Sequence, residues 1–263
     1  MAFIELLKDE SFHRWKDFGP KEIQYLRYAE NDPSIVASGH KVQDVYFAFA
    51  SARASFLHSN SGNFGDISGA DDVSRLFART HFLNNAILEY AICLDLSWQV
   101  VWAFIQPASL KYLINQDYTL MEKECTRDSI LEQLKCIISQ NGVGVVKAQR
   151  LLDIVTKFDK LENTIKLRSL YNKLKHQGTI HYQGLGLNDY EMMFEVDGKC
   201  PPMLHRPSYK PEEIESLLFN YHDSFKQYME SLITEIFPAD YTSNKINGAE
   251  ALASMFTIRY AMD

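Results

Sequence analysis

The sequence of 263 residues lacks the features that mark secreted proteins, metalloproteins and broadly nucleic-acid-binding proteins. It has only four cysteines, which are far apart and form no C-x-x-C pair: Cys93, Cys125, Cys136 and Cys200. This spacing indicates neither a disulfide framework nor a zinc site, and we expect reduced thiols. The net charge of −7 argues against an overall basic surface, so any binding of phosphates has to be local.

Signals for export, membrane insertion and cofactor binding are also missing. The first ten residues lack the basic and apolar regions of a signal peptide. The most apolar stretch, residues 86–105, is interrupted by polar side chains such as Glu89 and Asp95, which favours a buried helix over a membrane span. No glycine-rich phosphate loop occurs, and the predicted long helices carry no Glu-x-x-His or His-x3-His spacing. We therefore expect a cytoplasmic protein without metal or cofactor.

The residues that are present favour helices. Hydrophobic residues make up 46% of the chain, enough for a large core, and they recur at spacings of three and four. Start and stop signals predict two short helices within 1–31, five long ones and a short terminal one. The long helices are predicted at 33–57, 72–105, 120–140 (opened by Thr119 to Glu122) and 144–176, with a further long helix at 212–236 and the short one from about 249.

One segment departs from the helical pattern. Residues 179–196 contain two short apolar runs around a Gly-rich turn, which is typical of a β-hairpin. The sequence thus predicts an all-α fold, a bundle of four to five long helices with a small β-hairpin insertion and short terminal helices. The expected division is a helical arm over 1–31, a bundle over 32–237 and a helical tail over 238–263.

The most distinctive stretch is the end of the helix predicted over 144–176. Its inward stripe, which includes Phe158 and Ile165, is predicted to turn polar after Ile165. Helical spacing then puts Leu167, Leu170, Tyr171 and Leu174 on one side. The opposite side carries Arg168, Asn172, Lys175 and His176.

This polar face has a local excess of positive charge. Between Lys166 and His181 the chain has four Lys or Arg residues and no acidic residue, so a backbone phosphate fits there. His176 is predicted at the C-terminus of this helix, and a histidine can transfer protons near neutral pH. Cations are also ordinary stabilising residues at this position. The residue types alone fit a nucleic-acid contact, a degenerate ribonuclease site or a solvated surface.

Long helices and the Asn172-x3-His176 pattern resemble the HEPN superfamily of all-α, nucleotide- and RNA-associated proteins. Active members use an Arg-Asn-x3-His motif for metal-independent RNA cleavage in a cleft at a dimer interface. The resemblance covers residues 34–236 and implies catalytic roles for Asn172 and His176, and RNA contacts for Arg168, Lys173 and Lys175. Tyr171 occupies the place of the motif arginine, so the chain resembles a variant whose ribonuclease site is degenerate.

Two hypotheses follow from these residues. The first is a homodimeric, RNA-associated protein that, if it is an enzyme at all, is a metal-independent endoribonuclease. The second is a non-catalytic dimeric module that binds a protein partner. A weaker polar cluster lies on the helix predicted from 72, where we interpret it as a solvated flank: Arg79, His81, Asn84, Asn85 and Glu89. Asp95 on the same helix is expected to have a polar partner or to face outward.

Overall fold

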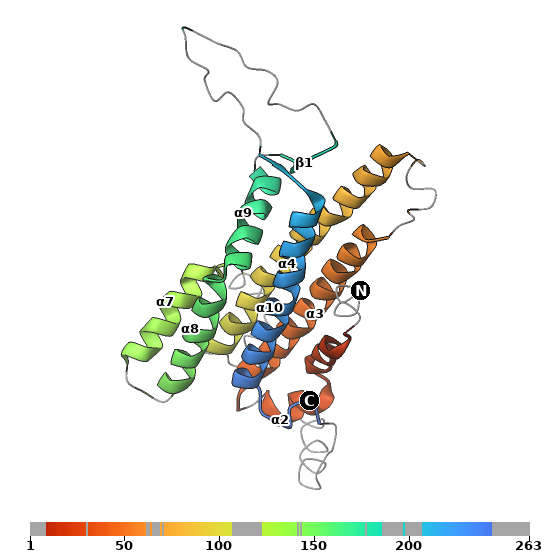
Figure 1. The fold of residues 1–263 in the computed structure, drawn as a ribbon. Coiled ribbons are helices and arrows are strands. Elements are labelled where there is room, and N and C mark those ends of the chain that lie inside the picture. The colour runs from red at the N-terminus through yellow and green to blue at the C-terminus, as the bar shows by residue number, and fades with distance from the viewer. Residues whose placement is uncertain are drawn as a thin grey trace. The chain divides into compact units, whose positions relative to one another are not determined.

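The computed structural model of the protein describes residues 9–29, 31–61, 64, 69, 71–106, 123–140, 142, 144–176, 178–185, 197 and 207–243. Helices dominate these residues, which confirms the all-α class (Figure 1). The elements are η1 (Ser11–Phe18), α2 (Glu22–Tyr28), α3 (Pro33–Ser59), α4 (Asp72–Ile105), α7 (Arg127–Ser139), α8 (Val145–Asp159), α9 (Glu162–His176), β1 (His181–Tyr182), β2 (Ser208–Tyr209) and α10 (Pro211–Ile236).

The residues at the helix starts explain where α3 and α4 begin. Pro33 opens α3, where its missing amide proton costs nothing. Before α4, the Asp71 carboxylate accepts a hydrogen bond from the Ser74 amide at 2.9 Å. The observed ranges of α3, α4 and α10 agree with the predicted ranges to within a few residues. Both short N-terminal helices lie within residues 1–31, as predicted.

The helix predicted over 120–140 begins later than expected. Residues 123–126 are not helical, and α7 starts at Arg127 because Thr126 and Ser129 cap it reciprocally. The Thr126 hydroxyl accepts from the Ser129 amide at 3.1 Å, and the Ser129 hydroxyl accepts from the Thr126 amide at 2.9 Å. The predicted cap, Thr119 to Glu122, lies outside the described residues.

The helix predicted over 144–176 is two helices, since the chain breaks between Asp159 and Glu162. Leu151, Val155 and Phe158 form the buried side of α8, and the same spacing carried forward reaches Ile165. Instead, α9 buries Thr164, Leu167 and Leu170. The buried residues of α9 do not continue the buried spacing of α8. Ile165 is 56% exposed, so the prediction of one continuous stripe ending at Ile165 was wrong.

The described strands form a pairing that the sequence does not predict. β1 pairs in parallel with β2, with His181 opposite Ser208 and Tyr182 opposite Tyr209. β2 lies just before α10, in a segment for which the sequence predicts no strand. The predicted second strand of the hairpin, 190–196, and the predicted helix from about 249 lie outside the described residues, so the three-part division of the chain stays a prediction.

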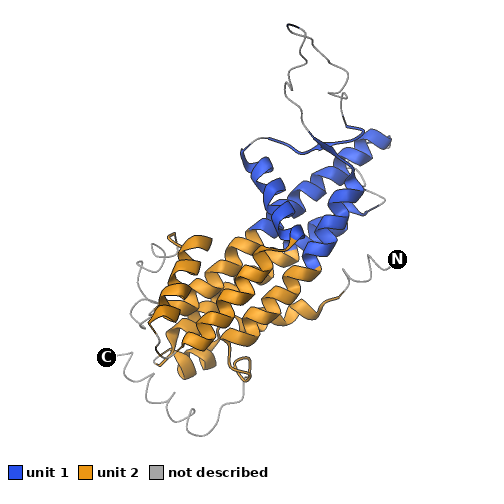
Figure 2. Cartoon of the chain, turned by 60° about the vertical axis from the view of Figure 1, so that its left-hand side comes forward, with its two compact units in different colours: residues 1–7, 51–91, 162–222 blue, residues 8–50, 92–161, 223–263 orange. Residues whose placement is uncertain are grey.

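Close contacts group the described residues into two units (Figure 2). Unit 1 contains those within 51–91 and 162–222, and unit 2 those within 9–50, 92–161 and 223–243. The division falls inside α3, α4 and α10, so each of these helices contributes residues to both units.

In unit 1, polar contacts order four helical segments. The Ser51 and Ser55 hydroxyls of α3 donate to the Glu89 carboxylate of α4 at 2.8 and 2.7 Å. The Asn163 side chain of α9 donates to the Asn220 carbonyl of α10 at 3.0 Å. The core between these segments is apolar and includes Phe56, Leu83, Ile87, Leu167, Leu170, Leu218 and Tyr221.

Unit 2 has an aromatic core. Phe49 of α3 contacts Phe12 and Trp15 of η1, with ring centroids 5.1 Å apart in both pairs, and it stacks on Phe225 of α10 at 5.5 Å. Phe158 of α8 stacks on Tyr228 at 4.2 Å. Such rings bury large apolar areas, so they account for much of the stability of this unit.

Burial accounts for the apolar composition of α4. Among the described helices it alone is long and apolar enough to cross a membrane, with a mean hydropathy of 1.3 over an 18-residue window. However, 61% of that window is buried inside the protein. This agrees with the interpretation of 86–105 as a buried helix.

Gly39 of α3 is tightly packed against its neighbours in unit 2, and this packing can be tested by substitution. A Cβ on Gly39 would lie 2.3 Å from the hydroxyl oxygen of buried Tyr241 and 2.6 Å from the Phe18 carbonyl oxygen. We expect Gly39→Ala to lower the free energy of unfolding by about 1–3 kcal/mol, seen as a fall of several degrees in Tm. Gly142→Ala is the control, because nothing lies within 4 Å of its Cβ position. Equal Tm values for the two variants would contradict this packing.

Candidate nucleic-acid interface

The C-terminal half of α9 presents the polar face that the sequence predicts. Leu167 and Leu170 are buried, whereas Asn172, Lys175 and His176 are exposed. Arg168 is half-buried, and helical spacing puts it with these three residues inside a sector of about 100°. The exposed apolar side chain of Ile165 lies within the same sector, one turn before Ser169.

Two lysines of this helix end lie over aromatic rings. The Lys173 ammonium is 5.3 Å from the centroid of the Tyr209 ring on β2, and the Lys175 ammonium is 5.6 Å from the centroid of the Tyr171 ring. Cation–π contacts of this kind contribute about 0.5–1 kcal/mol at exposed sites. The Tyr171 ring therefore restricts the position of the neighbouring Lys175 ammonium.

The local positive charge is smaller than the sequence suggests. Lys166 was counted among the cations, but its ammonium pairs with the Glu162 carboxylate one turn earlier at 2.5 Å. The last turn of α9 carries Lys173, Lys175 and His176, where the helix dipole stabilises positive charge. The other cations of this stretch are Arg168, Lys173 and Lys175.

Asn172 and His176 are one turn apart on the exposed side of α9. A catalytic histidine works best in a site that excludes water and holds the reacting group in place. These two residues are solvent-exposed in the described chain and do not line the groove beside them. The geometry of a single chain favours ligand contact over general acid or base catalysis.

A groove of about 460 Å³ lies beside this face, between α9, β2 and the first turns of α10. Its lining residues come from three separate parts of the sequence: Glu162, Asn163, Lys166, Ser169, Leu170, Tyr209, Glu213, Ile214, Ser216, Leu217 and Asn220. The sequence does not indicate this groove, because the contribution of Tyr209 depends on the pairing of β2 with β1. No spacing signal in the sequence indicates that pairing.

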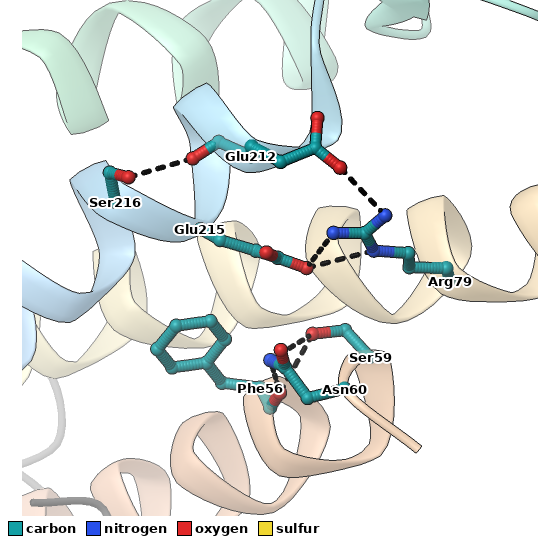
Figure 3. A network of polar contacts seen from close by, with 7 residues as sticks. All are labelled: Phe56, Ser59, Asn60, Arg79, Glu212, Glu215 and Ser216. Atoms are coloured by element: carbon teal, nitrogen blue, oxygen red, sulfur yellow. Dashed lines mark hydrogen bonds and ion pairs between the residues drawn. The ribbon is translucent and has the colours of Figure 1, made fainter. Parts of the chain in front are cut away.

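Three residues of the weaker polar cluster of α4 bind side chains of other segments (Figure 3). The Arg79 guanidinium binds the Glu215 carboxylate through Nε at 2.8 Å and Nη2 at 2.7 Å, and it reaches Glu212 through Nη1 at 2.9 Å. Asn84 accepts a hydrogen bond from the Tyr182 hydroxyl at 2.9 Å. With Glu89 bound to two serines, this cluster is structural, while Asp95 is exposed.

Burial dominates the electrostatics of the Arg79 cluster. The Glu215 side chain is 11% exposed, and burial raises the pKa of its carboxyl although Arg79 opposes the shift. The pKa of the Glu212 carboxyl is lowered, chiefly by hydrogen bonding to its own backbone amide and then by Arg79. Glu215 therefore depends on Arg79 more than Glu212 does.

Comparison with known proteins adds no family assignment, because no protein-family model, curated protein or solved structure matches the chain. Among the described residues, no group of three His, Cys, Asp or Glu side chains is placed to hold a metal ion. The resemblance to the HEPN superfamily thus rests on Asn172, His176 and the helical architecture, and it stays a prediction.

Removing the guanidinium tests the role of Arg79. We expect Arg79→Ala to lower the free energy of unfolding by about 2–4 kcal/mol at pH 7, because it leaves the buried Glu215 carboxylate unpaired. An acid whose folded pKa is raised binds more protons folded than unfolded, so stability falls as pH rises above its usual pKa of 4.5. The loss should therefore be smaller at pH 5 than at pH 7 in denaturant titrations.

Arg75→Ala is the matched control, one turn earlier on α4. Arg75 pairs only loosely with exposed Asp72, at 4.0 Å, so its removal should change stability by less than about 0.5 kcal/mol at either pH. Equal effects of the two substitutions, or a pH-independent loss in Arg79→Ala, would show that this ion pair does not hold Glu215.

Proposed function

We propose that this chain is a HEPN-like, RNA-associated protein that binds RNA phosphates through the end of α9 and does not cleave them. The observation that carries the proposal is the exposure of Asn172, Lys175 and His176 on one sector with Arg168, on a chain of net charge −7. Positive charge concentrated at one place on an acidic chain suits a local contact with an anionic polymer.

The aromatic contacts of the lysines support this function. Tyr209 and Tyr171 lie under the ammonium groups of Lys173 and Lys175, which restricts where those charges sit. Interleaved basic and aromatic side chains are typical of surfaces that bind single-stranded nucleic acid. Cations alone stabilise the C-terminus of a solvent-exposed helix, so helix stability does not account for the aromatic rings beside them.

The residues argue against cleavage. In the family that the chain resembles, an arginine beside the asparagine stabilises the phosphate as charge develops in the transition state. Tyr171 occupies that position and carries no positive charge. Exposed His176 alone lacks both the electrostatic partner and the dry environment that general acid–base catalysis requires.

The salt dependence of RNA binding tests the proposal. We expect Lys173→Ala/Lys175→Ala to weaken binding of single-stranded RNA and to reduce the slope of log K against log salt by about 1.4, since each lost phosphate contact removes about 0.7. Fluorescence anisotropy at several salt concentrations measures both. The control is Lys157→Ala/Lys160→Ala, which removes the same charge from exposed positions of the other unit.

The outcomes separate binding from catalysis. No affinity of the parent protein for RNA at about 50 mM salt, or equal losses in the two double variants, would contradict the proposal. RNA cleavage in EDTA that disappears in His176→Ala would show instead that the site is an active metal-independent ribonuclease. Each cation in the last turn stabilises α9 by about 0.3–1 kcal/mol, so its removal lowers the stability of the variant. Binding should therefore be measured well below the Tm of each variant.

A dimeric protein-interaction module is the second candidate, and one feature of unit 1 favours it. Val73 and Phe77, one turn apart on α4, are 60% and 66% exposed. They line an apolar groove of about 640 Å³ together with Phe82 and Leu185. Exposed apolar surfaces of this kind mark sites of protein association.

This second candidate predicts that Phe77→Asp converts a dimer into a monomer, because a charge placed at the interface loses its water without gaining a partner. Sedimentation over a range of concentrations measures the change. Phe47→Asp is the control, since Phe47 is 61% exposed and belongs to unit 2. A parent protein that stays monomeric, or a dimer that Phe77→Asp leaves intact, would contradict the role of this groove in self-association.

A further inference from the structure

We propose that the groove between α9, β2 and α10 accepts one base of a single-stranded RNA, with the ring of Tyr209 as its stacking surface. This inference rests on the proposed function, in which RNA phosphates contact the end of α9. It places one base of that RNA in the groove. It adds a substrate class, single-stranded RNA with exposed bases, and names residues that recognise it.

The size and lining of the groove suit a nucleoside. Its volume of about 460 Å³ falls within the range of small-ligand sites, about 300–1,000 Å³. Leu170, Ile214 and Leu217 supply apolar contacts, while Ser169 and Ser216 supply hydroxyl groups. The apolar side chains suit the flat faces of a base, and the polar side chains, which are the majority of the lining, suit its polar edges.

The carboxylates that line the groove favour a base over a phosphate as its occupant. Glu162 and Glu213 line it, and Glu162 already pairs with Lys166. The Glu213 carboxylate is exposed and accepts one hydrogen bond from the Lys210 amide at 3.3 Å, which leaves further acceptor capacity. A carboxylate repels phosphate but accepts hydrogen bonds from the exocyclic amino groups of adenine, cytosine and guanine. Uracil has no such group, so we expect it to bind less tightly.

The groove is continuous with the phosphate-binding face. Ser169 lines the groove, and Lys173 and His176 follow it at the next two turns of α9 on adjoining positions. Lys173 also contacts the ring of Tyr209, so one cation lies at the boundary between groove and face. A base in the groove therefore leaves its phosphate beside Lys173. A duplex keeps its bases stacked inside the helix and cannot enter in this way.

Substituting Tyr209 tests the stacking surface. We expect Tyr209→Ala to weaken binding of a short oligo(A) by about 5- to 100-fold, the usual effect of removing one base–aromatic stack, without changing the salt slope. Tyr209→Trp should retain binding because it keeps an aromatic face. Thermal unfolding of each variant checks that β2 still pairs, and Phe47→Ala is the control for loss of an exposed ring.

The choice of probe tests the remaining parts of the inference. Oligo(A) should bind more tightly than oligo(U), and Glu213→Gln should reduce that preference; a short RNA duplex should bind weakly. If oligo(A) binding depends on Lys173 and Lys175 but not on Tyr209, or if the duplex binds as tightly as oligo(A), the groove takes no base while the proposed function stands. If the parent protein binds no RNA at low salt, the proposed function itself is wrong.

Discussion

The ion pair between Arg79 and Glu215 is the constraint on which the arrangement of unit 1 depends. It joins α4 to α10 across 136 residues of sequence and compensates a carboxylate that is nearly buried. β2 ends at Tyr209, two residues before α10 begins, so fixing the start of α10 also fixes the ring that lines the groove. A polar cluster that sequence reasoning treated as a solvated flank thus holds the candidate site in place.

Local signals were enough to predict most helices. The caps before α3 and α4 and the apolar stripes of α4 and α10 are contained in a few neighbouring residues, and the structure follows them. The polar side of α9 was predictable for the same reason. Spacing along one helix fixes which of Asn172, Lys175 and His176 face away from Leu167 and Leu170.

What failed depended on tertiary contacts. The break between α8 and α9 sets which side of α9 is buried, and no proline or glycine marks it in the sequence. The parallel pairing of His181 with Ser208 joins segments that local patterns treat separately. Tyr209 acquires its position beside Lys173 only through that pairing, so its contact with the basic face could not be predicted from the sequence.

We propose that this acidic protein binds RNA through a small basic and aromatic surface at the end of α9. Hydrogen exchange with and without a short oligo(A) tests it most directly, because it locates the contact without a substitution. We predict slowed exchange at residues 168–176 and 208–210, with little change at 72–82. Unchanged exchange at the end of α9 in the presence of saturating RNA, or protection confined to 72–82, would contradict the account.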